Sequence, residues 1–207
     1  MRRRGDAWKN CENMKKFDTP LPVKLVCALL YKEETWRKQA LIDLQIEFGE
    51  IDYESDPLEF HFTEYYFKEM GQPLFRYFAS FSRLIDPADL AVIKVWTNSL
   101  EQKYSQLAGQ MRVINIDPGY LNLTAFILAT SKNYAHRIYL GKGVFAQQEL
   151  LFERRKIQTL DWTYPDYRSY EYQEILRKIR GIYASQMKSR QDGNFSAPSV
   201  SKIQESS

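Results

Sequence analysis

The ten residues PVKLVCALLY, from Pro22 to Tyr31, form a nearly continuous apolar run that is bounded by proline on one side and by charged residues on the other. A strand with one face in water alternates apolar and polar residues, whereas a strand that is buried on both faces shows an unbroken apolar run. We therefore expect this segment to be a central strand of a β-sheet.

The segments after this run give the order of the remaining elements. Glu33 to Phe48 places apolar residues at helical spacing and is followed by Gly49, which can end a helix. Asp86 and Pro87 are typical of a helix start, because aspartate can cap the first turn and proline suits its first position. The predicted elements are a strand at 22–31, a helix at 33–48, a strand ending at 60–62, a strand at 74–85, a helix at 87–109 and a strand at 112–116.

This order of strand, helix, strand, strand, helix and strand predicts an α+β fold with a ferredoxin-like split βαβ core. Asp117-Pro118-Gly119 is then expected to break the last strand, and residues 120–130 are predicted to form a helix on the sheet, with a strand as the alternative. Gly141-Lys142-Gly143 predicts a hairpin turn between 136–140 and 144–153, and helical spacing predicts a final helix at 171–187. We expect one domain at residues 21–187 between a disordered N-terminal segment, 1–20, and a disordered C-terminal tail, 188–207.

The distribution of charge and apolar residues argues against several classes of partner. Residues 1–20 hold six Lys and Arg against three Asp and Glu, residues 188–207 hold three against two, and the remainder carries a net charge of −1. Binding to duplex nucleic acid needs clustered positive charge on the folded part, so we expect none. The chain starts without the apolar region of a signal peptide, and no stretch reaches the ~18 apolar residues of a membrane helix. We therefore expect a cytoplasmic protein that does not bind membranes.

Four segments hold more polar and aromatic side chains than packing requires: FTEYY at 62–66, NIDPGY at 115–120, HRIYLG at 136–141 and WTYPDYR at 162–168. In order and spacing these segments resemble the prokaryotic domain-of-unknown-function family 4416 (DUF4416), over residues 20–182. Some members of that family are called GTP-binding proteins, so the resemblance implies GTP or another nucleotide as a candidate ligand. The chain has no G-x-x-x-x-G-K-[ST] run, so a nucleotide would be held by a geometry other than the P-loop.

These segments supply the candidate site residues, which we expect to converge on one cleft. They are Asp117 and His136 as catalytic residues, and Arg137, Tyr120, Tyr164, Asp166 and Arg168 as ligand-binding residues. Arg137 is expected to grip a phosphate or carboxylate through two donors, while His136 donates a hydrogen bond or a proton. Asp117 is a candidate general base or Mg²⁺ ligand, and no residue is assigned to a resident metal site. The structural alternatives are turn capping for Asp117, an ordinary strand start for His136 and Arg137, and loop packing for the aromatic residues.

The function that we expect from these residues is the binding of a nucleotide or another phosphorylated small molecule in a cleft lined by tyrosine and arginine. Residues 132–180 carry a net charge of +4, which either forms an ordinary solvated surface or receives such an anion. One alternative function is a phosphoester-processing enzyme that uses Asp117 and His136. His61-Phe62-Thr63 resembles half of a two-histidine phosphoesterase site, but His136-Arg137-Ile138 lacks the hydroxyl of the second half. A second alternative is a non-catalytic scaffold or interaction protein.

Overall fold

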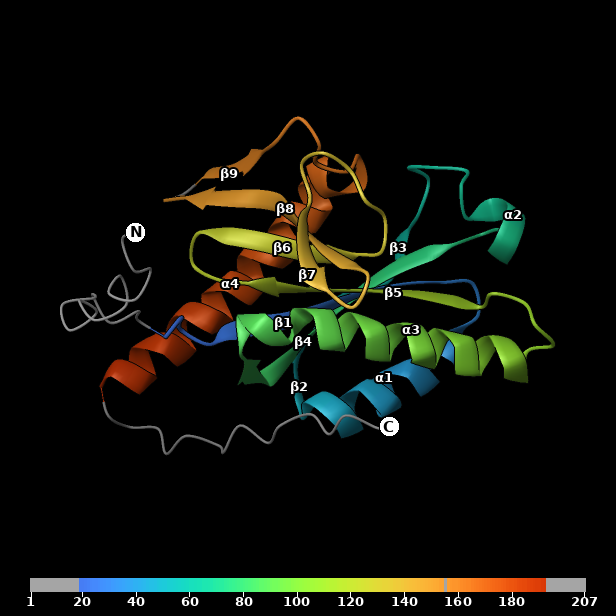
Figure 1. Ribbon diagram of the computed structural model, residues 1–207, viewed down its shortest axis with the longest axis horizontal. Coiled ribbons are helices and arrows are strands. Elements are labelled where there is room, and N and C mark those ends of the chain that lie inside the picture. Colours follow the sequence, from blue (N-terminus) through green and yellow to red (C-terminus); the bar gives the residue numbers. More distant parts are fainter. Residues whose placement is uncertain (1–18, 155, 193–207) are drawn as a thin grey trace, which may run out of the picture.

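The computed structural model describes residues 19–154 and 156–192, which form one large antiparallel sheet covered by helices (Figure 1). The strands are β1 (Val23–Tyr31), β2 (Ile51–Glu54), β3 (Leu58–Glu59), β4 (Phe75–Ile85), β5 (Ile114–Leu121), β6 (Ala125–Thr130), β7 (Ile138–Gly141), β8 (Val144–Glu153) and β9 (Lys156–Thr159). The helices are α1 (Glu34–Phe48), α2 (Phe67–Met70), α3 (Leu90–Leu107) and α4 (Tyr170–Gln191), with short 3-10 turns at Pro87–Asp89 and Asp166–Arg168.

The predicted central strand is confirmed. All nine residues of β1 are buried, and β1 pairs with β4 on one side and β5 on the other. Alternate side chains serve two hydrophobic clusters, because successive residues of a strand point to opposite faces. Leu25, Cys27 and Leu29 pack with α1 and α3, whereas Val26 and Ala28 pack with α4. The sheet therefore lies between a layer formed by α1 and α3 and a layer formed by α4 (Figure 1).

The α+β class is confirmed, but the sheet is larger than the expected ferredoxin-like core. Its nine strands follow the order β2-β4-β1-β5-β6-β8-β7, with β3 added to β4 and β9 added to β8. The hairpin around Gly141-Lys142-Gly143 is present as β7 and β8, and β9 is an additional strand that the sequence did not indicate. The final helix continues to Gln191, four residues past the predicted end of the domain. The N-terminal segment 1–18 and the tail 193–207 of the prediction lie outside the described residues.

Asp86 caps the turn before α3, as predicted, by accepting a hydrogen bond from the Ala88 N–H. In contrast, the predicted break at Asp117-Pro118-Gly119 and the predicted helix at 120–130 are wrong. Strand β5 runs through all three residues, and residues 125–130 form β6. Gly119 allows this arrangement, because a Cβ at this position would lie 2.5 Å from the backbone oxygen of Ile127 in β6. The glycine is needed for a close approach between two strands, not for a turn.

Within the described part of the chain, no strand pairs with the first half of β5 on the side away from β1, and the candidate site lies at this gap. Strand β6 pairs with β5 only from Gly119 onward, so the backbone of Ile116 lacks a β6 partner. Helix α3 supplies side chains instead: Glu101 accepts from the Ile116 N–H at 2.8 Å, and Lys94 donates to the Ile116 carbonyl at 2.8 Å. These bonds satisfy the backbone groups at the strand edge while leaving open the space between β5 and β6.

Among the described residues, no helix is long and apolar enough to cross a membrane.

Candidate functional site

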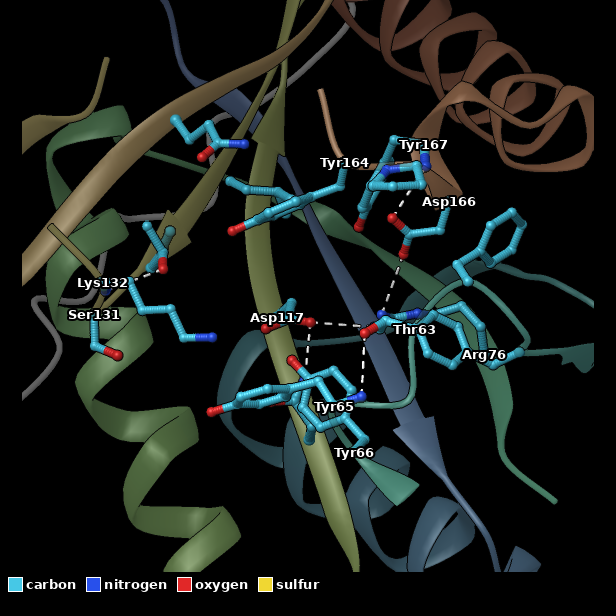
Figure 2. A pocket seen from close by; sticks show the side chains of 18 of the residues that line it. Thr63, Tyr65, Tyr66, Arg76, Asp117, Ser131, Lys132, Tyr164, Asp166 and Tyr167 are labelled. Carbon is cyan, nitrogen blue, oxygen red and sulfur yellow. Dashed lines mark hydrogen bonds and ion pairs between the residues drawn. The ribbon is translucent and has the colours of Figure 1, made fainter. Parts of the chain in front are cut away.

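A cavity of about 580 Å³ opens beside this unpaired half of β5 (Figure 2). Its floor is formed by β4 and β5, and one side by α3. The remaining walls are the end of β6 with Gln147 of β8, and three loop segments: FTEYY after β3, residues 131–132 after β6, and residues 164–167 before α4. Segments that are far apart in the sequence thus meet around one hollow, as expected of a site that a rigid sheet presents through its loops.

The floor of the cavity holds a buried arginine between two carboxylates. The side chain of Arg76, from β4, is only 4% exposed. Its Nη1 lies 3.2 Å from Asp117 Oδ2, and its Nη2 lies 3.4 Å from Asp166 Oδ2. Its guanidinium also stacks over Phe60, with 5.2 Å between Cζ and the ring centroid. Because a buried guanidinium needs compensating charge, these contacts fix Arg76 and both aspartates in place (Figure 2).

The two carboxylates of this floor differ in their electrostatic environment. Burial acts to raise the pKa of Asp117, but the charges of Lys94 and Arg76 and hydrogen bonds from Arg76 and Asn115 outweigh it, so this pKa lies below its usual value. Burial raises the pKa of Asp166, and Arg76 offsets only part of that rise. Asp117 is therefore a stable anion and a weak base, whereas Asp166 takes up a proton more readily.

The α3 side of the cavity carries a second set of ion pairs. Lys94 Nζ lies 3.7 Å from Asp117 Oδ1. Arg112 lies between two glutamates, with Nη1 2.9 Å from Glu69 Oε2 and Nη2 3.3 Å from Glu101 Oε2. Burial raises the pKa of Glu101, against the opposing effect of Lys94 and the bond from the Ile116 N–H. Lys94 and Arg112 are thus already paired with carboxylates.

Aromatic rings form the wall of the cavity that faces α3, and they also surround its mouth. Tyr66 packs edge-on against Tyr65, with 5.0 Å between their centroids, and Arg112 lies over the Tyr66 ring. At the mouth, Lys132 Nζ lies 4.2 Å from the centroid of Tyr65, within the range of a cation–π contact. Figure 2 shows Tyr65 and Tyr164 on opposite sides of Asp117, with Lys132 reaching toward the same space. The cavity therefore offers ring faces on two sides and a cation at its entrance.

Three of the predicted site residues line this cavity, namely Asp117, Tyr164 and Asp166. His136 and Arg137 stand behind the wall. Arg137 donates to the Gln147 Oε1 at 2.7 Å, to the Lys132 carbonyl at 2.6 Å and to the Tyr164 hydroxyl at 2.6 Å. Protein oxygens thus occupy the guanidinium of Arg137, and its predicted contact with an anion stays a prediction. Arg137 holds three residues of the lining in place, namely Lys132, Gln147 and Tyr164.

His136 also has a protein partner in place of a ligand. Its ring stacks between Tyr134 and Trp162, at interplanar angles of 17° and 9°. Its Nε2 lies 3.0 Å from the Gln147 Oε1, and since an amide oxygen only accepts, Nε2 carries the proton. Asp117 lines the cavity and His136 does not, so the pairing of the two residues around one reacting group stays a prediction.

Tyr120 and Arg168 do not line the cavity. Tyr120 packs against buried side chains of the α1 and α3 layer, because it is three positions from Asp117 on the same strand and points to the other face. Arg168 donates to the carbonyls of Thr163, Leu160 and Asp161 and so holds the loop before α4. Arg168 thus serves the loop, and a contact of either residue with a ligand stays a prediction.

The sequence prediction missed five charged residues of the lining, which are Arg76, Lys94, Glu101, Arg112 and Lys132. A signal for two of them was present. Arg76 is the one charged residue in the first eight positions of β4, Phe75 to Ser82, and Lys94 shares a helix face with the buried Leu90, Ile93 and Thr97. A charged residue on a buried face needs a partner and is uncommon without a functional or structural reason. Lys132 is exposed on a loop and gave no such signal.

Comparison with known proteins identifies the family. The model of the family described as a domain of unknown function, DUF4416, matches residues 21–183. The chain belongs to the DUF4416 family. The matched span of DUF4416 includes every residue of the cavity and the segments that hold its walls. No curated protein and no solved structure gives a significant match to the chain.

Proposed function

We propose that this DUF4416 protein binds a nucleotide or another phosphorylated small molecule in the cavity beside β5. The observation that carries the proposal is the composition of the lining, in which aromatic faces and cationic groups meet in one hollow of about 580 Å³. Pockets for small ligands have this size and combine ring surfaces with a few convergent polar groups. Arginine and lysine are the side chains that bind phosphate oxygens.

The two parts of the lining suit the two parts of such a ligand. Tyr65 and Tyr164 offer faces on which a flat ring can stack, as nucleobases do on aromatic side chains. Polar side chains of Asn98, Thr130 and Ser131 are available for its heteroatoms. Four cationic side chains, those of Arg76, Lys94, Arg112 and Lys132, line the same cavity as these rings. GTP, implied by the sequence resemblance, is one member of this ligand class.

The alternative of a phosphoester-processing enzyme that uses Asp117 and His136 is less well supported. The lowered pKa of Asp117 makes it a poor base, and its oxygens are engaged by Arg76, Lys94 and Asn115. His136 does not line the cavity; its ring stacks on Trp162 and its Nε2 bonds to Gln147, which does line it. We therefore favour binding over catalysis, and over a scaffold role that would leave the charged cavity without a use.

Isothermal titration calorimetry with nucleoside monophosphates and phenyl phosphate tests the proposal. We expect at least one of these probes to bind the wild-type protein with a stoichiometry of one. Tyr65→Leu should weaken binding by about 1–3 kcal/mol through the lost stacking. Tyr170→Leu is the matched control, because Tyr170 is 74% exposed and lies outside the cavity. Equal weakening by both substitutions, or no binding of any probe, would contradict the proposal.

A further inference from the structure

The charges around the cavity limit the charge of the ligand, if the proposed function holds. Four cationic side chains line the cavity, namely Arg76, Lys94, Arg112 and Lys132, and three carboxylates line it, namely Glu101, Asp117 and Asp166. The lining therefore carries one positive charge in excess. A ligand whose charge far exceeds this excess would face carboxylates without matching cations, and like charges at short range in a partly buried site are costly.

Three of the four cations are already neutralised by the protein. Arg76 is shared by Asp117 and Asp166, Lys94 lies beside Asp117, and Arg112 lies between Glu101 and Glu69. A ligand phosphate near them competes with these carboxylates. Such cations support one further anionic group weakly and cannot match the several charges of a polyphosphate.

Lys132 is the exception. Among residues 19–154 and 156–192, no carboxylate lies within ion-pair distance of its ammonium group, which rests over the ring of Tyr65 at the cavity mouth. Figure 2 shows this side chain extending into the cavity toward Asp117. The Lys132 carbonyl is held by Arg137, which also holds Tyr164 on the facing wall. Arg137 thus fixes the position of Lys132 relative to the ring of Tyr164.

We infer that the cavity takes a flat-ring ligand with a single phosphate group, such as a nucleoside monophosphate, and that Lys132 is the residue that contacts this phosphate. Nucleoside diphosphates and triphosphates are disfavoured, because their additional charges meet only neutralised cations and the carboxylates that pair with them. Arg137 is a positioning residue for Lys132 and Tyr164. This inference rests on the proposed function and makes it more specific.

The inference is tested by calorimetry with adenosine, AMP, ADP and ATP and with the matching guanosine series. The buffer contains EDTA, so that no divalent cation neutralises the polyphosphates. The proteins are the wild type, Lys132→Gln and the control Lys178→Gln, whose lysine is exposed on α4. We expect the monophosphate to bind at least tenfold more tightly than the triphosphate of the same base. Lys132→Gln should weaken monophosphate binding about tenfold and leave nucleoside binding unchanged, while Lys178→Gln leaves both unchanged.

The outcomes separate the inference from the function on which it rests. Triphosphates that bind as tightly as monophosphates, or a Lys132→Gln protein that binds both like the wild type, would overturn the inference and leave the proposed function standing. Equal loss of nucleoside and monophosphate binding in Lys132→Gln would also overturn it, because the lysine would then hold the ring and not the phosphate. Absence of binding by every probe would overturn the proposed function itself.

Discussion

Replacing Arg76 by methionine should show how strongly the floor of the cavity depends on its buried cation. Methionine keeps the length of the apolar stem of the side chain and removes its charged end. Asp166, which is 6% exposed, and Asp117 would then lose the guanidinium that lies 3.4 and 3.2 Å from them. Removal of one partner from a buried ion pair leaves uncompensated charge, so the free energy of unfolding should fall by about 3–5 kcal/mol.

The loss in Arg76→Met should depend on pH in a defined direction. Without Arg76, the pKa of both aspartates rises relative to the wild type, so each binds a proton more readily in the folded variant than in the folded wild-type protein. The variant should therefore be most destabilised above pH 7 and should recover part of the loss as the pH falls toward 4.5. Urea denaturation followed by circular dichroism at pH 5 and pH 8 measures both values.

Two further variants control for unrelated effects of this substitution. Arg177→Met removes a partly exposed arginine that pairs with Glu174 on α4 and should cost less than about 1 kcal/mol. Adding Asp166→Asn to Arg76→Met should restore part of the lost stability, because it removes one of the stranded charges. A loss below 1 kcal/mol for Arg76→Met, equal at pH 5 and pH 8, would refute this account of the floor.

Other parts of the molecule support three further predictions. Gly119→Ala should lower the free energy of unfolding by about 3 kcal/mol, because the new methyl group lies 2.5 Å from the Ile127 carbonyl oxygen. In the control Gly181→Ala, the methyl group meets nothing within 4 Å, so this substitution should stabilise α4. Equal effects of the two substitutions in urea denaturation would contradict this prediction. Cys27 is fully buried and burial raises the pKa of its thiol, so mass mapping should find residue 27 unmodified by iodoacetamide until urea unfolds the protein. Burial raises the pKa of Glu149 from 4.5 to about 7, so the stability that this group contributes is complete below pH 4.5 and is lost as the pH rises to 7. Relative to Glu149→Gln, the free energy of unfolding of the wild type should fall by up to about 3 kcal/mol over this range. Equal pH dependence of the free energy of unfolding in the two proteins would exclude the effect.

The parts of the fold that the sequence predicted are those with a strong local pattern. The unbroken apolar run of β1 and the aspartate and proline before α3 act over a few residues, and both predictions are confirmed. The segment Phe126-Ile127-Leu128 suits a helix or a strand equally well, so its pattern could not decide. Gly119 was interpreted as a break, because the reason for a glycine there is the backbone of β6, which only the folded structure brings close.

The same distinction separates the predicted and missed parts of the site. Asp117, Tyr164 and Asp166 belong to dense polar and aromatic segments and could be selected from the sequence. The residue that joins them, Arg76, lies 41 and 90 positions away from the two aspartates, and no local pattern connects them. Arg137 had the right chemistry for an anion contact, but whether an arginine faces a ligand or a neighbouring carbonyl depends on loops whose course the sequence does not reveal.

Mass spectrometry of small molecules released from the purified, denatured protein tests the central claim most directly. Wild-type protein is compared with Ser131→Trp, which places a large ring at the cavity mouth, and with Ser185→Trp on the exposed face of α4. We predict a molecule with a flat ring and one phosphate group, retained by the wild type and by Ser185→Trp and absent from Ser131→Trp. Two results would contradict the claim that this cavity is a binding site. The first is retention of the same molecule by all three proteins. The second is that none of the three retains a molecule from a nucleotide-rich cell extract, even when nucleotides are added to saturation before purification.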